Sequence, residues 1–69
     1  MISKEIISDR KAFYVQEGKI ELKNAMDYLH AHCDNWKEDN EKMYTEILNR
    51  AGMYMDKALA MEELLSIEA

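Results

Sequence analysis

The sequence is poor in the residues that interrupt helices. It contains no proline and only two glycines, Gly18 and Gly52, among 69 residues. Proline and glycine are the strongest local signals for turns and loops, so no stretch of the chain looks like a boundary between domains. No internal repeat divides it either. We therefore predict a single helical domain over residues 1–69.

Cysteine and long apolar runs are also scarce. Cys33 is the only cysteine, so no disulfide can form within the chain, and this favours a reducing compartment. No apolar run approaches the roughly 20 residues of a membrane-spanning helix, and the first residues lack the basic and apolar regions of a signal peptide. These observations predict a cytoplasmic protein that makes no contact with a membrane.

Basic residues are outnumbered by acidic ones. Nine Lys and Arg residues stand against 14 Asp and Glu residues, which gives a formal net charge of -5. A chain of this sign repels phosphate backbones, so we expect no direct binding of nucleic acid. Because the acids are interleaved with lysines, solvated helix surfaces explain them better than mimicry of a nucleic acid.

The chain lacks the parts of an active site. A chain of this length buries only about 60% of the surface that its unfolded form exposes, which leaves no room for a large cleft. It has three serines and no glycine-rich loop, and no nucleophile is accompanied by an evident base and oxyanion or phosphate cradle. We therefore expect neither enzymatic activity nor a cofactor.

The remaining signals are helix starts and stops. Ser3 is a suitable N-cap for a first helix, and Gly18 stands where a glycine often ends one. After Gly18 the apolar positions resume in a shifted phase, which predicts a separate second helix over residues 19–33. These positions are Leu22, Met26, Leu29 and Cys33.

A third helix is predicted over residues 36–67. Asn35 followed three residues later by Glu38 resembles a capping box at its start. Gly52 is its weak point, because a glycine inside a helix costs about 1 kcal/mol relative to alanine. The sequence leaves open whether this helix is continuous, kinked or broken at Gly52.

The predicted fold class is all-α. It consists of a short helix, a second helix and a long C-terminal helix, arranged as a helical hairpin or a three-helix bundle. One alternative stays open for residues 12–22, where Tyr14 and Val15 favour a strand and a β-hairpin would replace the first helix break.

The predicted C-terminal helix has a wide apolar face. At about 100° per residue, one apolar stripe contains Trp36, Met43, Ile47, Ala51, Tyr54, Ala58, Met61 and Leu65. A second stripe beside it contains Tyr44, Leu48, Met55 and Leu59. The two preceding helices can cover only one stripe, so the second predicts self-association, most simply as a homodimer. Met53 points away from both stripes and is a further candidate for contact with another protein.

One cluster carries metal-ligating side chains. It consists of His30, His32, Cys33 and Asp34. A structural zinc site needs four ligands, and a helix would bring only two or three of these to one side. We therefore predict no metal site, and we expect Cys33 to pack in the core as a small apolar residue.

Two residues near the start of the C-terminal helix have predicted structural roles. Trp36 is expected to anchor the preceding turn by packing on Leu29 and Cys33. Asn40 interrupts the apolar stripe, and we interpret it as an exposed residue of the first helical turn.

Two classes of function fit these features. The first is a protein-interaction module: a small regulator, adaptor or inhibitor, of the kind that phages and mobile elements encode. The second is a helical oligomer that binds a small ligand, nucleotide or metal between its protomers. A crevice for such a ligand could be lined by Arg10, Tyr14, Lys23, Tyr28 and His30.

Overall fold

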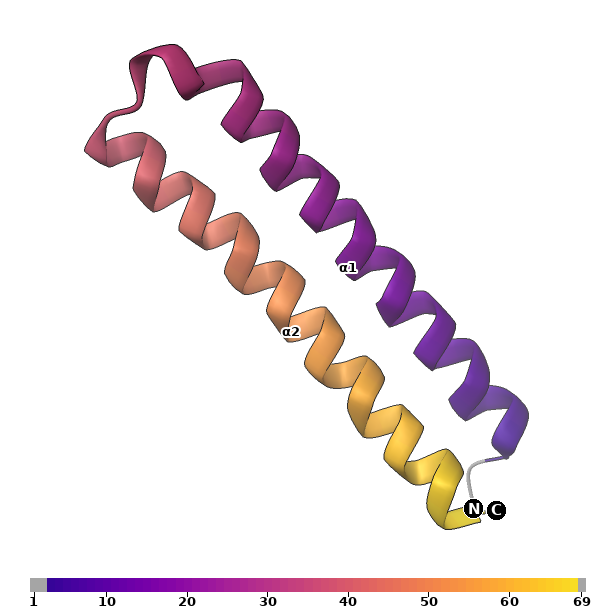
Figure 1. Ribbon diagram of the computed structural model, residues 1–69. Helices are drawn as coiled ribbons and strands as arrows, with labels where there is room; N and C mark the ends of the chain where they lie inside the picture. Colours follow the sequence, from indigo (N-terminus) through magenta and orange to yellow (C-terminus); the bar gives the residue numbers. More distant parts are fainter. Residues whose placement is uncertain (1–2, 69) are drawn as a thin grey trace.

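Two long helices make up the fold (Figure 1). The computed structural model describes residues 3–68, with helix α1 over Lys4–His32, a 3-10 turn η1 over Cys33–Asn35 and helix α2 over Glu38–Glu68. The helices run antiparallel and side by side, and the molecule is a rod with extents of 51 × 15 × 14 Å. Residues 3–68 contain no strand, so the prediction of an all-α fold is confirmed.

The side chains that face the opposite helix recur at alternating intervals of four and three residues, which is the heptad spacing of coiled coils. In α1 they are Ile7, Lys11, Tyr14, Gly18, Glu21, Ala25 and Tyr28. In α2 they are Asn40, Tyr44, Ile47, Ala51, Tyr54, Ala58, Met61 and Leu65. All of these residues are buried or half-buried. The helices therefore meet along one narrow seam.

Small residues form most of the buried part of the seam. Within residues 3–68, Ile7 and Ile47 are the only large apolar side chains that are buried. The other buried residues are Gly18, Ala25, Ala51 and Ala58. Such short side chains let two helix backbones lie close together, but they bury little apolar surface.

Contacts between the helices define a constant register along the seam. The cross-helix partners are Lys11 and Glu62, Tyr14 and Lys57, and Glu21 and Arg50. In each pair the two residue numbers add up to between 71 and 73. In this register Gly18 lies level with Tyr54 and Ala25 lies level with Ile47. Large and small residues thus face each other, which fills a narrow seam efficiently.

The predicted helix break at Gly18 is wrong. Helix α1 continues through Gly18, and no glycine among the described residues has the positive φ of a helix-ending cap. Gly18 is instead a point of close contact, because a Cβ atom there would lie 2.7 Å from Cε of Met55. The alternative β-hairpin is wrong for the same reason, since residues 12–22 are helical. Helix α2 is likewise continuous through Gly52.

The two helix starts are built differently. Ser3 caps α1 as predicted, because its Oγ accepts a hydrogen bond of 3.3 Å from the backbone N–H of Ile6. The capping box predicted for Asn35 and Glu38 is not formed, since Asn35 lies in η1 and α2 begins only at Glu38.

Asn40 supplies the cap of α2 and is half-buried, which corrects its interpretation as an exposed residue. Its Oδ1 accepts a 2.9 Å hydrogen bond from the backbone N–H of Lys37, the residue before the helix. Its Nδ2 donates a 2.9 Å hydrogen bond to the hydroxyl of Tyr28 in α1. Through these two hydrogen bonds, Asn40 links the start of α2 to the end of α1.

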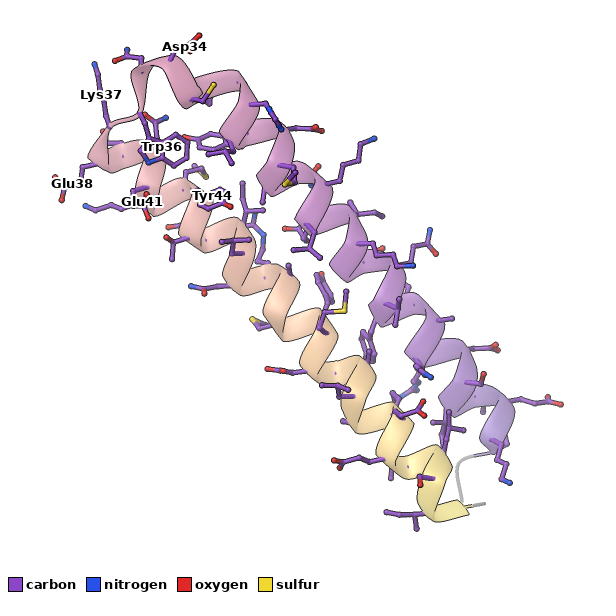
Figure 2. All side chains as sticks on the ribbon, viewed as in Figure 1. Asp34, Trp36, Lys37, Glu38, Glu41 and Tyr44 are labelled. Atoms are coloured by element: carbon purple, nitrogen blue, oxygen red, sulfur yellow. The ribbon has the colours of Figure 1, made fainter. Side chains whose placement is uncertain are left out.

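Trp36 packs at the turn on two tyrosines, which the sequence pattern does not predict. Its half-buried ring packs edge-to-face on Tyr28 and Tyr44, with ring centroids 5.9 and 5.7 Å apart. Its Nε1 donates a 2.9 Å hydrogen bond to the carboxylate of Glu41. Figure 2 shows Trp36 directed between the helices. The predicted burial of Cys33 is wrong, because this residue begins η1, just after the end of α1, and is exposed.

We expect Gly18→Leu to lower the free energy of unfolding by about 1–3 kcal/mol, because the new side chain must displace the Met55 side chain and also fit a buried seam position level with Tyr54. Leucine is the better helix former, so propensity alone predicts the opposite sign. Urea unfolding followed by circular dichroism at one fixed protein concentration measures the change.

The matched control is Gly52→Ala, since no heavy atom lies within 4 Å of the Cβ position of Gly52. In the monomeric chain, at a protein concentration too low for self-association, that change should raise the free energy of unfolding by about 0.5–1 kcal/mol. In addition, Met55→Ala should cost less in the Gly18→Leu background than in the wild-type chain. Stabilisation by Gly18→Leu would contradict the close contact.

We expect Asn40→Ala to lower the free energy of unfolding by about 1–2 kcal/mol, because the helix cap and the bond to Tyr28 are both lost. Tyr28→Phe should cost less, since it leaves the cap intact. The control is Asn49→Ala, at an exposed position of the same helix. Thermal and urea unfolding compare the three variants, and an equal effect at both asparagines would speak against the cap.

Candidate functional site

The two grooves that flank the seam differ in chemistry. On one side, Nε of Arg50 donates a 2.7 Å hydrogen bond to Oε2 of Glu21, and Nζ of Lys57 lies 5.6 Å from the ring centroid of Tyr14. These charged side chains cross the groove between the helices. The groove on the opposite side is lined by Lys11, Val15, Met55, Ala58, Leu59 and Glu62. Its only charged groups are the ion pair of Lys11 and Glu62.

The apolar lining of this second groove continues along both helices. Residues seven positions apart lie on the same side of a helix in a heptad pattern. In α1, Val15 is followed at this interval by Leu22 and Leu29. In α2, Met55 is preceded by Leu48. Two apolar rows therefore border the groove, one on each helix.

We call this surface the Gly52 face. It consists of Val15, Leu22, Met26, Leu29, Leu48, Met55 and Leu59, with Gly52 among the α2 residues. Leu59 is 63% exposed and Met26 is 53% exposed. Glu41 and Glu62 end the α2 row, and Lys19, seven residues before Met26, lies among the α1 residues of the face. The face is thus mainly apolar, with charged side chains at Lys19 and at the ion pair of Lys11 and Glu62.

The structure separates the five predicted contact residues. Leu48, Met55 and Leu59 lie on the Gly52 face. Tyr44 belongs to the seam, where its ring packs on the indole at the turn. Met53 is 58% exposed and lies on the other side of α2. Three of the five residues therefore share one continuous surface.

The contribution of α1 to this surface was missed by the sequence pattern. Leu22, Met26 and Leu29 were expected in the core of a separate second helix. They lie beside the seam instead, and Leu22 and Met26 are exposed. The available signal was the shift of apolar phase after Gly18. In a continuous α1, that shift means that the two apolar sets lie on opposite sides of the helix.

The metal-ligating side chains near the turn do not converge. The ring of His32 lies 4.5 Å from that of Tyr28, and Sγ of Cys33 lies 3.4 Å from the backbone carbonyl of His30. Among the described residues, no group of three or more His, Cys, Asp or Glu side chains is placed to hold a metal ion.

The side chains proposed to line a small-ligand crevice are also dispersed. Tyr14 and Tyr28 lie in the seam about 21 Å apart, at about 1.5 Å per residue. Arg10, Lys23 and His30 are exposed on other parts of α1. The structure does not bring these five residues into one site.

No protein-family model matches the chain, and no curated protein or solved structure shows significant similarity to it. Over the part of the chain that the structure describes, neither helix has an apolar stretch sufficient to cross a membrane. Exposed apolar side chains such as Phe13 and Met53 also lie on the other side of the helices, where charged side chains cross the groove, whereas on the Gly52 face apolar rows of both helices border an apolar groove.

We expect the thiol of Cys33 to react with a thiol reagent such as DTNB in the folded protein nearly as completely as in the urea-unfolded chain, because it is exposed. Cys33→Ser should change the free energy of unfolding by no more than about 0.5 kcal/mol, as is usual for surface substitutions. A thiol that reacts only after unfolding would contradict the exposed position.

Proposed function

We propose that this chain is a non-enzymatic protein-interaction module, a small regulator, adaptor or inhibitor that binds another protein through the Gly52 face. The observation that carries the proposal is the mainly apolar strip formed by both helices. Within it Leu59 is 63% exposed, Met26 is 53% exposed and Leu22 is 41% exposed. Patches of this kind usually mark binding surfaces.

The shape of the face favours a helical partner. A groove between two parallel ridges of side chains accepts an amphipathic helix, which inserts apolar residues at intervals of three and four positions. The side chains that would receive such a helix are Val15 on α1 and Met55 and Leu59 on α2, which line the groove together. Two of them, Met55 and Val15, are already half-buried, so their position is partly fixed before binding.

The size of the face is sufficient for specific binding. Full burial of one large apolar side chain contributes about 1.5–3 kcal/mol to binding. Association costs about 4–15 kcal/mol, because two molecules lose translational and rotational entropy when they form one complex. Several large side chains must therefore be buried together for a stable complex. Four of the seven apolar side chains of the Gly52 face are exposed and three are half-buried, so several can be buried further in one complex.

We expect Leu59→Glu to abolish capture of the partner, because the new carboxylate would be buried without a counter-ion in the interface. Quantitative affinity purification from cells that naturally contain the chain, followed by titration with the purified partner, measures this. The proposal requires one foreign protein in fixed stoichiometry with the wild-type chain and its loss with Leu59→Glu.

The matched control is Leu64→Glu, which replaces an exposed leucine of the same helix on the opposite side, seven residues after Lys57. Both variants change the net charge by the same amount, and both should retain the helical circular dichroism spectrum. Capture that survives Leu59→Glu, or that fails only with Leu64→Glu, would contradict binding through the Gly52 face.

A further inference from the structure

We infer that a second copy of this chain covers the Gly52 face when no other partner is bound, so that two helix pairs form a four-helix assembly. This inference rests on the proposed function, because it assigns an occupant to the same face.

The first argument is the amount of exposed surface. The accessible surface of the chain is 5357 Å². A compact monomer of 8.1 kDa exposes about 4,500 Å². The surplus of about 900 Å² is close to the roughly 800 Å² that each partner buries in a stable interface of standard size. A second copy, which is a rod of the same length, can bury this surplus.

The second argument is the distribution of charge. Each copy carries a formal net charge of -5, so two copies can meet only where acidic side chains stay out of the contact. The Gly52 face comes nearer to this condition, because Glu41 and Glu62 lie near its ends and Glu62 is paired with Lys11. The opposite side carries Glu17, Asp27 and Glu46 along its length.

The third argument is Gly52 itself. A glycine within a helix costs about 1 kcal/mol relative to alanine, and no heavy atom lies within 4 Å of its Cβ position. Nothing within the chain therefore requires a glycine there. Leu48 and Met55 border the position on the side of the groove, and Asn49 and Asp56 border it on the outer side, so Gly52 leaves open space at the edge of the apolar row. A helix of a second copy that packs closely on α2 accounts for the missing side chain.

A consequence is that self-association and partner binding exclude each other. The same side chains, Leu48 and Leu59 above all, would be buried in either complex. A partner must then compete with dimer formation, so the observed free energy of partner binding is reduced by the free energy of dissociating the dimer. The concentration of the chain therefore determines the fraction of molecules whose Gly52 face is free to bind a partner.

The test is the molar mass in solution, measured by multi-angle light scattering across the micromolar range. The wild-type chain and Leu64→Glu should have twice the 8.1 kDa mass of one chain, and Leu59→Glu should have the mass of one chain. Gly52→Leu is a second, uncharged probe. It fills the open space with a better helix former, so it should weaken the dimer by at least about tenfold in dissociation constant while the helical content is kept.

A wild-type chain that is monomeric throughout this range, or a dimer that Leu64→Glu breaks and Leu59→Glu does not, would overturn the inference. Affinity purification separates this failure from failure of the proposed function. A monomer that still captures a foreign protein through Leu59 would show that the face is correct and the second copy is not its occupant. A dimer that captures nothing else would support the inference and contradict the proposed function.

Discussion

The structure depends on a seam that is too narrow to hold the apolar side chains of two long helices. Helices of 29 and 31 residues face each other along positions that are largely Gly, Ala, Tyr and charged residues. Ile7 and Ile47 are the only large apolar side chains buried among the described residues. Apart from Met61 and Leu65, the other described Leu, Ile, Met and Phe side chains lie outside the seam. The exposed apolar surface is therefore a direct consequence of how the helices are joined.

The close approach at the seam also explains where the sequence pattern misleads. A glycine near the middle of a helical region indicates a helix end or a site where another part of the chain packs over the glycine, and one sequence alone does not distinguish these. Gly18 is the second kind, because the side chain of Met55 packs over it. The apolar phases before and after Gly18 were interpreted as the cores of two helices. They are the two flanks of one helix, with Phe13 on one side and Leu22 on the other.

Helix α2 was easier to predict because its seam positions from Tyr44 to Leu65 are apolar or aromatic. Six residues of the predicted main stripe, from Ile47 to Leu65, lie in the seam. The error is confined to the first turns, where Met43 was placed in the stripe and Tyr44 beside it. The structure reverses them, since Met43 is 44% exposed and the ring of Tyr44 packs on Trp36. The contacts at the turn depend on which residues α1 brings there, and helix periodicity carries no such information.

The seam buries little apolar surface, whereas the Gly52 face exposes several large apolar side chains. This distribution couples folding of the chain to binding of a partner. A single core in a chain of this size supplies only about 3–5 kcal/mol, and here that core is mostly alanine. A partner present at 100 times its dissociation constant adds about 2.7 kcal/mol to the stability of the folded chain. Binding on the Gly52 face would thus contribute about as much to the folded state as the seam itself. In the proposed function, the occupant of Leu48, Met55 and Leu59 determines both what the chain does and what fraction of it is folded.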